Sequence, residues 1–427
     1  MARAAYGISY VPTTQGGYTS SQIGFSSTTT MITSNDGGHT PANTLNNPFP
    51  SGLIAPTGSS LGSLTAIGTN LTGALVNVGR GYSQQWNFTL QHQPWENWLF
   101  ELGYVGNRGV HLFMYNQNLN WLPDSVSSSY GASLANLVPN PFYGIIQSGP
   151  LAAATIPQAQ LLLPYPQFTA LPGSLQGGVV NPFSYVGDSI YHALTAKVEK
   201  RFSKGLSLLA AYSKSKLIDV GDNLTQVRPG GITGGLVEDW SNLRAERSKS
   251  LYDAPQRLVI TTLYELPFAK NSTRVVHAIA GGWQVNGIMT IQSGLPIPIQ
   301  MSANTFGADR PNVVSGVSDK PAQQSLAQWF NTAAFTAPAP YTYGNVSRTL
   351  PDISGDGLFN LDFSLFKNFT LREKYKFEFR AEAFNLTNTP TFEIPNSVYS
   401  TPTFGQVTAT AFTPKPRIVQ FGLRLDF

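Results

Sequence analysis

The sequence of 427 residues contains no cysteine, and charged residues make up only 12% of it. Without thiols the chain can have no disulfide, no thiolate metal site and no catalytic cysteine. The charged fraction is about half of the ~25% usual in soluble domains, which argues against an ordinary water-exposed surface. Aromatic residues also reach 12%, and such an abundance beside so few charges argues against intrinsic disorder.

Long apolar runs are missing too, since none approaches the ~20 residues of a membrane-spanning helix. The amino terminus, MARAAYGISYVPTT, lacks the apolar segment of a signal peptide. We therefore expect either a cytoplasmic protein or a chain that begins partway through a longer one. The net charge of +4 arises from 27 basic and 23 acidic residues. Because this small excess is not concentrated in one segment, no nucleic-acid partner is expected.

Candidate catalytic motifs are weak. Residues 58–62 (GSSLG) match the nucleophile elbow of hydrolases, but they lack the preceding strand and following helix that the motif needs. Residues 352–357 (DISGDG) lack the spacing and the final glutamate of an EF-hand, so we interpret them as a loop leading into a strand. The five histidines are scattered, without the spacing of a zinc protease. The sequence predicts no enzyme, no metal site and no cofactor.

The strongest pattern is an alternation of apolar and polar residues with a period of two. It is clearest in residues 81–93, 375–383 and 419–427. Because successive side chains of a strand point to opposite faces, each segment has one apolar and one polar face. Weaker alternations predict further strands at residues 4–11, 98–110, 190–202, 206–216, 257–266, 283–292 and 359–367.

The connections between these ten predicted strands alternate between long and short. The long ones are residues 12–80, 112–187, 217–256, 294–358 and 387–417. The tight ones are residues 94–97, 203–205 and 368–374, and residues 267–282 are intermediate. Many strands approach the ~9–11 residues that cross a bilayer obliquely. The pattern predicts an all-β, antiparallel, up-and-down transmembrane barrel, seen in part, with short periplasmic turns and long extracellular loops.

The alternation also assigns side chains to the two surfaces of the barrel. Apolar positions should face lipid, namely Trp86, Phe88, Leu90, Phe377, Phe379, Phe421 and Leu423. Polar positions should face the lumen, namely Lys376, Glu378, Arg380, Glu382 and Arg424. Amphipathic rings favour the membrane interfaces. The expected aromatic girdle is Trp95, Trp98 and Trp283 near the short turns, with Tyr82 and Tyr212 toward the long loops.

Six segments, taken in order, resemble Oar-like TonB-dependent transporters of the outer membrane. They are GYSQQWNFTLQHQPWENWLFELGYVGNRGVHL, YHALTAKVEKRFSKGLSLLAAYSKSKLID, DAPQRLVITTLYELPF, GGWQVNGIMTIQSGLPIPI, NLDFSLFKNFTLREKYKFEFRAEAFNLTNTPTF and PRIVQFGLRLDF. The resemblance implies that residues 1–427 are the carboxyl-terminal part of a receptor barrel of about 22 strands. The plug and an amino-terminal carboxypeptidase-regulatory-like domain are absent from this sequence. The implied location is the bacterial outer membrane, crossed many times.

The resemblance also implies partners. An intact receptor takes up a small solute or oligomer, here unknown, with energy from the TonB complex, which it contacts only through the missing plug region. Outer-membrane lipid surrounds the barrel. The last strand resembles the signal read by the barrel-assembly machinery, with Gln420, Gly422, Leu425 and Phe427 at the recognised positions.

Two alternatives remain at this point. The ten strands could form a self-contained, porin-like or adhesive small barrel, since barrels of this size exist. A secreted carbohydrate-binding β-sandwich would also show alternating apolar and polar residues. Its strands should be shorter, however, and its short and long connections should not lie at opposite ends of the sheet.

Overall fold

The computed structural model describes residues 1–10, 23–73, 75, 79–169, 178–221, 237–269, 272–301, 309–371 and 375–426. The chain forms two compact units. The first comprises Met1–Pro12, Gly79–Met114 and Tyr185–Phe427, and the second comprises Thr13–Val78 and Tyr115–Ser184.

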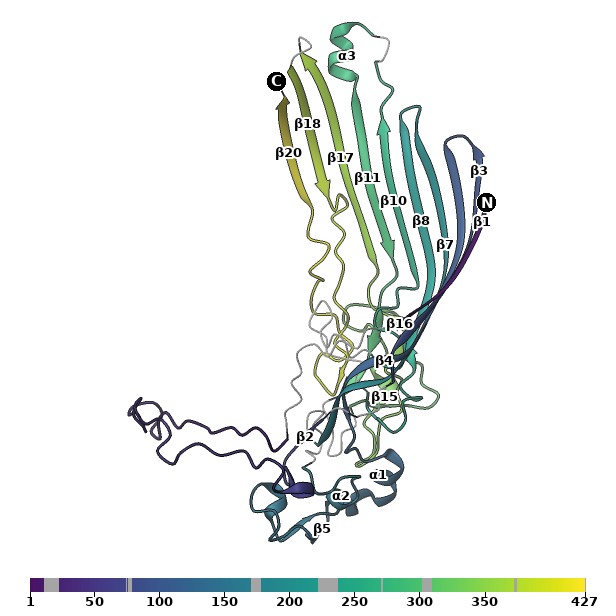
Figure 1. The fold of residues 1–427 in the computed structure, drawn as a ribbon. Helices are drawn as coiled ribbons and strands as arrows, with labels where there is room; N and C mark the ends of the chain where they lie inside the picture. Colours follow the sequence, from purple (N-terminus) through teal and green to yellow (C-terminus); the bar gives the residue numbers. More distant parts are fainter. Residues whose placement is uncertain are drawn as a thin grey trace. The chain divides into compact units, whose positions relative to one another are not determined.

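A long antiparallel sheet organises the first unit (Figure 1). Its main order is β1-β3-β4-β7-β8-β10-β11-β17-β18-β20, so each strand pairs with the strands before and after it in that series. The order ends at β1 and at β20, and the barrel is therefore not closed by these strands. The strands are β1 (Ala2–Tyr10), β3 (Tyr82–Trp95), β4 (Trp98–Asn118), β7 (Val179–Ser203), β8 (Leu206–Asp219), β10 (Gln256–Glu265), β11 (Trp283–Gln292), β17 (Leu358–Leu371), β18 (Tyr375–Phe384) and β20 (Ile418–Asp426).

All ten predicted strands are confirmed, but β4 and β7 are longer than the alternation indicated. β4 continues past residue 110 and β7 begins before residue 190. The interrupted pattern around Gly187 has a steric reason, since a Cβ there would lie 2.9 Å from the carbonyl oxygen of Leu112. A glycine permits this close approach of two backbones, although it breaks the alternation of side chains.

The strand ends that tight connections join lie at one end of the sheet, and those that long connections join lie at the other, as predicted (Figure 1). In the β7–β8 turn, Lys204 and Gly205 have φ values of 52° and 81°. Two successive positive φ values are typical of the type I′ turn, whose twist matches that of the paired strands. The intermediate connection between β10 and β11 contains a short helix, α3 (Arg274–Ala280).

The long connections of the first unit contain a hydrophobic core cluster. Short strands pair there: β12 (Pro296–Pro298) with β16 (Thr349–Ser354), β13 (Gln300–Met301) with β19 (Val398–Tyr399), β14 (Asn312–Val313) with β15 (Phe335–Thr336), and β9 (Ser248–Lys249) with β8. The 3-10 helix η4 (Thr332–Ala334) precedes β15. The core is formed by Ile297, Ile299, Phe330, Ala334, Phe335, Val346, Leu350 and Ile353. Part of the segment 352–357 is thus strand, because Leu350 and Ile353 anchor β16 in this core.

The second unit is built from small elements. They are η1 (Gly62–Leu64), β2 (Leu71–Thr72), α1 (Asp124–Tyr130), η2 (Gly131–Ala135), β5 (Leu137–Pro139), η3 (Pro150–Ala152), β6 (Thr155–Pro157) and α2 (Gln158–Leu161). Ile146, Leu151 and Ile156 form its core. The serine-containing segment 58–62 consists of turns leading into η1, and Ser60 Oγ donates to the carbonyl oxygen of Thr57 at 2.5 Å. The strand and the α-helix that a nucleophile elbow needs do not flank this segment in the structure, as the sequence indicated.

Within the described ranges, no helix is long and apolar enough to cross a membrane.

Candidate functional site

The strand register places the predicted lipid-facing positions of β18 and β20 on one face. Phe379 pairs with Leu423, and Phe377 pairs with Leu425. Residues directly opposite each other in an antiparallel pair project to the same side. The rings of Phe379 and Phe421 accordingly stack, with centroids 6.4 Å apart.

The same face continues across the whole sheet. Phe379 pairs with Lys367, which pairs in turn with Trp283. Further pairs lead to β7, namely Ile291 with Leu258, Leu258 with Tyr212, and Tyr212 with Ala196. Between β4 and β7, the Tyr104 hydroxyl lies 2.8 Å from His192 Nδ1, and the Trp86 ring contacts the His192 ring. Trp86, Phe88 and Leu90 therefore share a face with Phe379, and we call it the apolar face.

Side chains on the apolar face are widely exposed to solvent. Phe421 and Leu423 are each 73% exposed, and Phe88 and Leu90 are 47% and 46% exposed. Leu102, Leu194, Phe363 and Leu425 extend the set beyond the positions that the sequence assigned to lipid. Such a broad exposed apolar surface marks a site that contacts something other than water.

The opposite, polar face holds the predicted lumen-facing residues. Glu378 pairs with Arg424, and Glu382 pairs with Gln420. The Arg380 guanidinium forms an ion pair with Glu378, and Gln420 Nε2 donates to Glu382 Oε2 at 2.6 Å. Leu209 and Ile288 are exceptions on this face, since both are apolar and exposed. The side chain of Lys376 and the whole of Phe427 lie outside the described residues.

Four of the five expected girdle residues lie at strand ends, and Tyr212 does not. Trp95 and Trp98 flank the β3–β4 turn with their ring centroids 6.3 Å apart, and Trp283 opens β11. Tyr82 opens β3 at the long-loop end, 6.0 Å from the Tyr10 ring. Tyr212 lies within β8, where its hydroxyl donates to Gln256 Oε1 at 3.0 Å.

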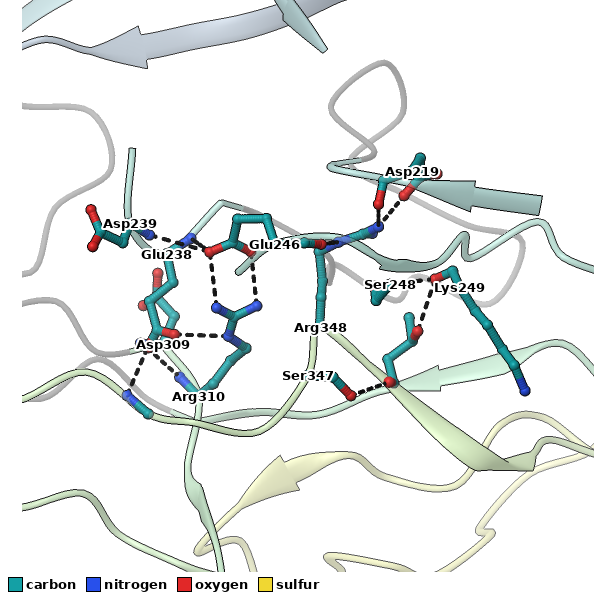
Figure 2. Close-up of polar contacts among 12 residues, drawn as sticks. Asp219, Glu238, Asp239, Glu246, Ser248, Lys249, Asp309, Arg310, Ser347 and Arg348 are labelled. Atoms are coloured by element: carbon teal, nitrogen blue, oxygen red, sulfur yellow. Dashed lines mark hydrogen bonds and ion pairs between the residues drawn. The ribbon is translucent and has the colours of Figure 1, made fainter. Parts of the chain in front are cut away.

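A buried network of charged residues lies among the long loops of the first unit (Figure 2). Arg310 donates to both oxygens of Glu246, at 2.8 and 2.9 Å, and its Nε donates to Glu238 Oε2 at 2.8 Å. Glu238 Oε1 also accepts the backbone amides of Asp309, Arg310 and Gly344, at 2.9, 3.2 and 3.3 Å. These contacts join three loop segments that are far apart in the sequence.

A second arginine connects this network to the sheet. Arg348, only 1% exposed, donates to the backbone carbonyl of Glu246 and pairs with Asp219 at the end of β8 (Figure 2). The hydroxyl of Thr349 donates to the carbonyl oxygen of Lys249 at 2.8 Å. The loops at this end are thus fixed to one another and to a strand.

Burial changes the acidity of the network. Burial raises the pKa of Glu238, although the charge of Arg310 opposes the rise. Burial, and next the charge of Glu238, raise the pKa of Asp309 to about 7. Asp309 Oδ2 is buried without a hydrogen-bond partner among the described residues. Within the same ranges, no cluster of His, Cys, Asp or Glu side chains could hold a metal ion.

Sequence reasoning missed this network. Glu238 and Glu246 lie in a stretch of mixed charge that resembles an ordinary hydrated loop. Their partner Arg310 follows 72 and 64 residues later, so no local spacing connects the three. Only the burial of the loops reveals the pairing.

Comparison with known proteins identifies the chain's family. The family model of the outer membrane beta barrel domain matches residues 1–420. No curated protein matches the chain.

Among solved structures, the chain is similar to three outer-membrane proteins. The outer membrane transporter YddB from Escherichia coli is 9% identical with a TM-score of 0.39, over 84% of this chain and 34% of that one. The ferripyoverdine receptor of Pseudomonas aeruginosa is 9% identical with a TM-score of 0.35, over 82% and 28%. The ferric-catecholate import receptor Fiu from Escherichia coli is 8% identical with a TM-score of 0.34, over 83% and 30%. The alignments therefore span about a third of the length of these proteins.

The family match covers nearly the whole chain, and its sheet has the meander order expected of such a barrel. The chain belongs to the outer membrane beta barrel domain family and is located in the bacterial outer membrane.

Proposed function

We propose that this chain forms part of the barrel wall of an Oar-like TonB-dependent transporter and contributes to energised uptake of a solute by the intact receptor. The observation that carries the proposal is the open sheet of ten long strands, with one apolar face and one polar face. The apolar face contacts lipid, and the polar face, with Glu378, Arg380, Glu382 and Arg424, lines a hydrated lumen.

The open edges support a larger barrel over a self-contained one. Among the residues that the structure describes, β1 and β20 each have one neighbour in the sheet, and they do not pair with each other. In lipid each unpaired backbone N–H or C=O costs several kcal/mol, so both edges require further strands. These strands belong to the rest of the receptor, together with the plug that contacts the TonB complex.

The long loops carry the ligand contacts in this proposal. Their segments are fixed by the Arg310 and Arg348 network, and binding residues are commonly found on loops that a rigid scaffold positions. The solute is a small molecule or an oligomer.

The terminal positions Gln420, Gly422 and Leu425 in β20 serve assembly. Packing against the neighbouring strand does not explain the glycine at position 422. A Cβ there would lie 3.8 Å from the Cβ of Arg380, which is an ordinary contact.

Reading the coding sequence upstream of Met1 tests the proposal directly. An in-frame segment encoding a plug and further barrel strands is the expected result. A stop codon followed by a signal peptide and Met1 would contradict it and favour the self-contained barrel.

A planar-bilayer experiment tests the same distinction on the protein. The protein purified from outer membranes, in the form in which the cell makes it, should show no steady conductance in potassium chloride, because a plug fills the lumen. Stable single-channel steps from the 427-residue chain alone would instead identify a small porin-like barrel.

A further inference from the structure

Helix α3 lies at the short-turn end of the sheet (Figure 1), and three of its apolar side chains are exposed to solvent. Val275, Val276 and Ile279 are 69%, 47% and 71% exposed. Their spacing of one and four residues places all three on one side of the helix. On the other side, His277 Nδ1 lies 3.0 Å from the carbonyl oxygen of Ala269.

The end of α3 is attached to the apolar face of the sheet. The carbonyl oxygen of Ile279 accepts from Lys367 Nζ at 2.6 Å and from Trp283 Nε1 at 3.1 Å. Lys367 and Trp283 are paired in the ladder, on the same face as Phe379. The Trp283 and Phe379 rings meet edge-on at 6.3 Å. The helix is therefore anchored on the side of the sheet that our proposed function assigns to lipid.

The surroundings of the Lys367 ammonium group indicate the depth in the membrane at which this anchor lies. Lys367 is 2% exposed, and its Nζ lies 4.8 Å from the centre of the Trp283 ring and 5.1 Å from that of Phe369. A lysine on a lipid-facing surface extends its ammonium group toward the polar interface, where carbonyl oxygens can accept from it. Trp283 belongs at the same level, because indole rings favour the membrane interface.

A second lysine on the apolar face behaves in the same way. Lys200 lies near the β7–β8 turn and pairs with Leu208, which is on the same face of β8 as Tyr212. Its Nζ donates to the carbonyl oxygens of Ser203 and Leu206 at 2.9 and 2.7 Å. Two lysines of the apolar face thus bind backbone carbonyl groups at the short-turn end, which is the behaviour expected at the headgroup level of one leaflet.

The geometry points to α3 as an interfacial helix, whose Val275, Val276 and Ile279 side chains enter the phospholipid of the periplasmic leaflet. The inference rests on the proposed function, because it needs the apolar face to contact lipid. The occupant follows from continuity, since the carboxyl end of α3 is hydrogen-bonded to Trp283 and Lys367 of the apolar face. A helix of this kind buries its apolar side about 5–10 Å into the boundary between headgroups and acyl chains. In this position α3 would set the height of the barrel wall in the membrane.

The absence of cysteine allows a direct test. The variant Ile279→Cys is labelled with bimane, purified from outer membranes and reconstituted in vesicles of phosphatidylethanolamine and phosphatidylglycerol. Lipids brominated at known depths should quench the label and place it about 5–10 Å below the headgroups. Aqueous iodide should quench it little.

Two further labels make the result specific. Glu96→Cys, in the exposed β3–β4 turn at the same end, should be quenched by iodide and not by brominated lipid. Phe379→Cys should be quenched by brominated lipid. If Ile279→Cys does not assemble, Val275→Cys at the same exposed side replaces it.

The outcomes separate the inference from the function on which it rests. Iodide quenching at position 279 with lipid quenching at position 379 would overturn the interfacial helix and leave the barrel wall intact. Iodide quenching at both positions would overturn the assignment of the apolar face. Protection of position 279 from both quenchers would show that protein, a second copy included, covers α3 and would also overturn the inference.

Discussion

Arg310 donates two parallel hydrogen bonds to Glu246, at 2.8 and 2.9 Å, although 64 residues separate them. Both side chains are almost completely buried, at 7% and 0% exposure. Paired bonds of this geometry are among the strongest polar contacts in proteins. The pair therefore fixes the loop that follows β8 to the loop that follows β11.

Removing the cation should release these loops. Arg310→Ala leaves the Glu238 and Glu246 carboxylates buried without their partner, and breaking a buried pair in this way costs roughly 3–5 kcal/mol. Limited proteolysis of outer-membrane preparations should then cleave near residues 238–246 and 309–314 much faster than in the wild type. Arg244→Ala, at an exposed position of the same loop, is the control and should change little. Equal cleavage of both variants would show that the network does not hold the loops.

The network should also weaken as the pH rises. The pKa of Asp309 is raised from 3.8 to about 7 in the folded loops. Between about pH 4 and 7 the closed state therefore binds more protons than the opened state, and its stability falls through this window. Hydrogen exchange at the amides of Arg310 and Gly344, expressed as protection factors, should show stronger protection at pH 5 than at pH 8.

The matched variant for this measurement is Asp309→Asn, which cannot ionise. It should reduce the pH dependence without abolishing it, because the pKa of Glu238 is raised as well. Protection that is constant with pH in the wild type, or higher at pH 8, would contradict the raised pKa of these carboxyls.

A charge should be tolerated on the polar face and not on the apolar face. Phe379→Arg should destabilise the folded protein by about 2–4 kcal/mol if the residue lies near the bilayer midplane. Thr261→Arg, at an exposed position of the polar face, should cost much less. Urea titrations in lipid vesicles, followed by the mobility shift of unheated samples on gels, compare the two. A larger loss for Thr261→Arg would reverse the assignment of the faces.

Loss of the terminal aromatic should impair assembly. Removing Phe427 takes an apolar anchor from the last strand, whose edge the assembly machinery receives by strand pairing. The variant should accumulate less in the outer membrane, and its periplasmic form should be open to proteolysis. Heat-modifiability on gels of outer-membrane fractions measures this, with Tyr130→Ala as the control. An unchanged yield of folded barrel would show that the terminus is not an assembly signal.

The parts of the fold that local periodicity controls could be predicted from the sequence. The alternation around Phe88 and Phe379 assigns the side chains of each strand to one of its two faces. The alternating lengths of the connections then indicate that successive strands are neighbours in a meander. The extension of β7 around Gly187 could not be predicted, because close backbone approach replaces side-chain alternation there. Helix α3 was hidden for a different reason, since seven residues are too few to establish a helical period.

The buried charges were hidden because their pairing is not local. Glu238 resembles a hydrated surface residue until the loops that bury it are in place. Its hydrogen bonds to the backbone of Asp309 and Gly344 depend on a tertiary arrangement that no spacing in the sequence encodes. The residues of each face, by contrast, could be grouped from the strand period alone, and the register places Phe379 opposite Leu423.

Accessibility scanning along β18 tests the central claim most directly. Single cysteines placed in turn at residues 377–383 of the otherwise cysteine-free chain carry a nitroxide, in protein reconstituted in lipid vesicles. Labels at Phe377, Phe379 and Ala381 should collide mainly with oxygen dissolved in lipid. Labels at Glu378, Arg380 and Glu382 should collide mainly with a water-soluble nickel reagent. Water exposure at Phe379 together with lipid exposure at Glu378, or no alternation along the strand, would contradict a transmembrane barrel wall.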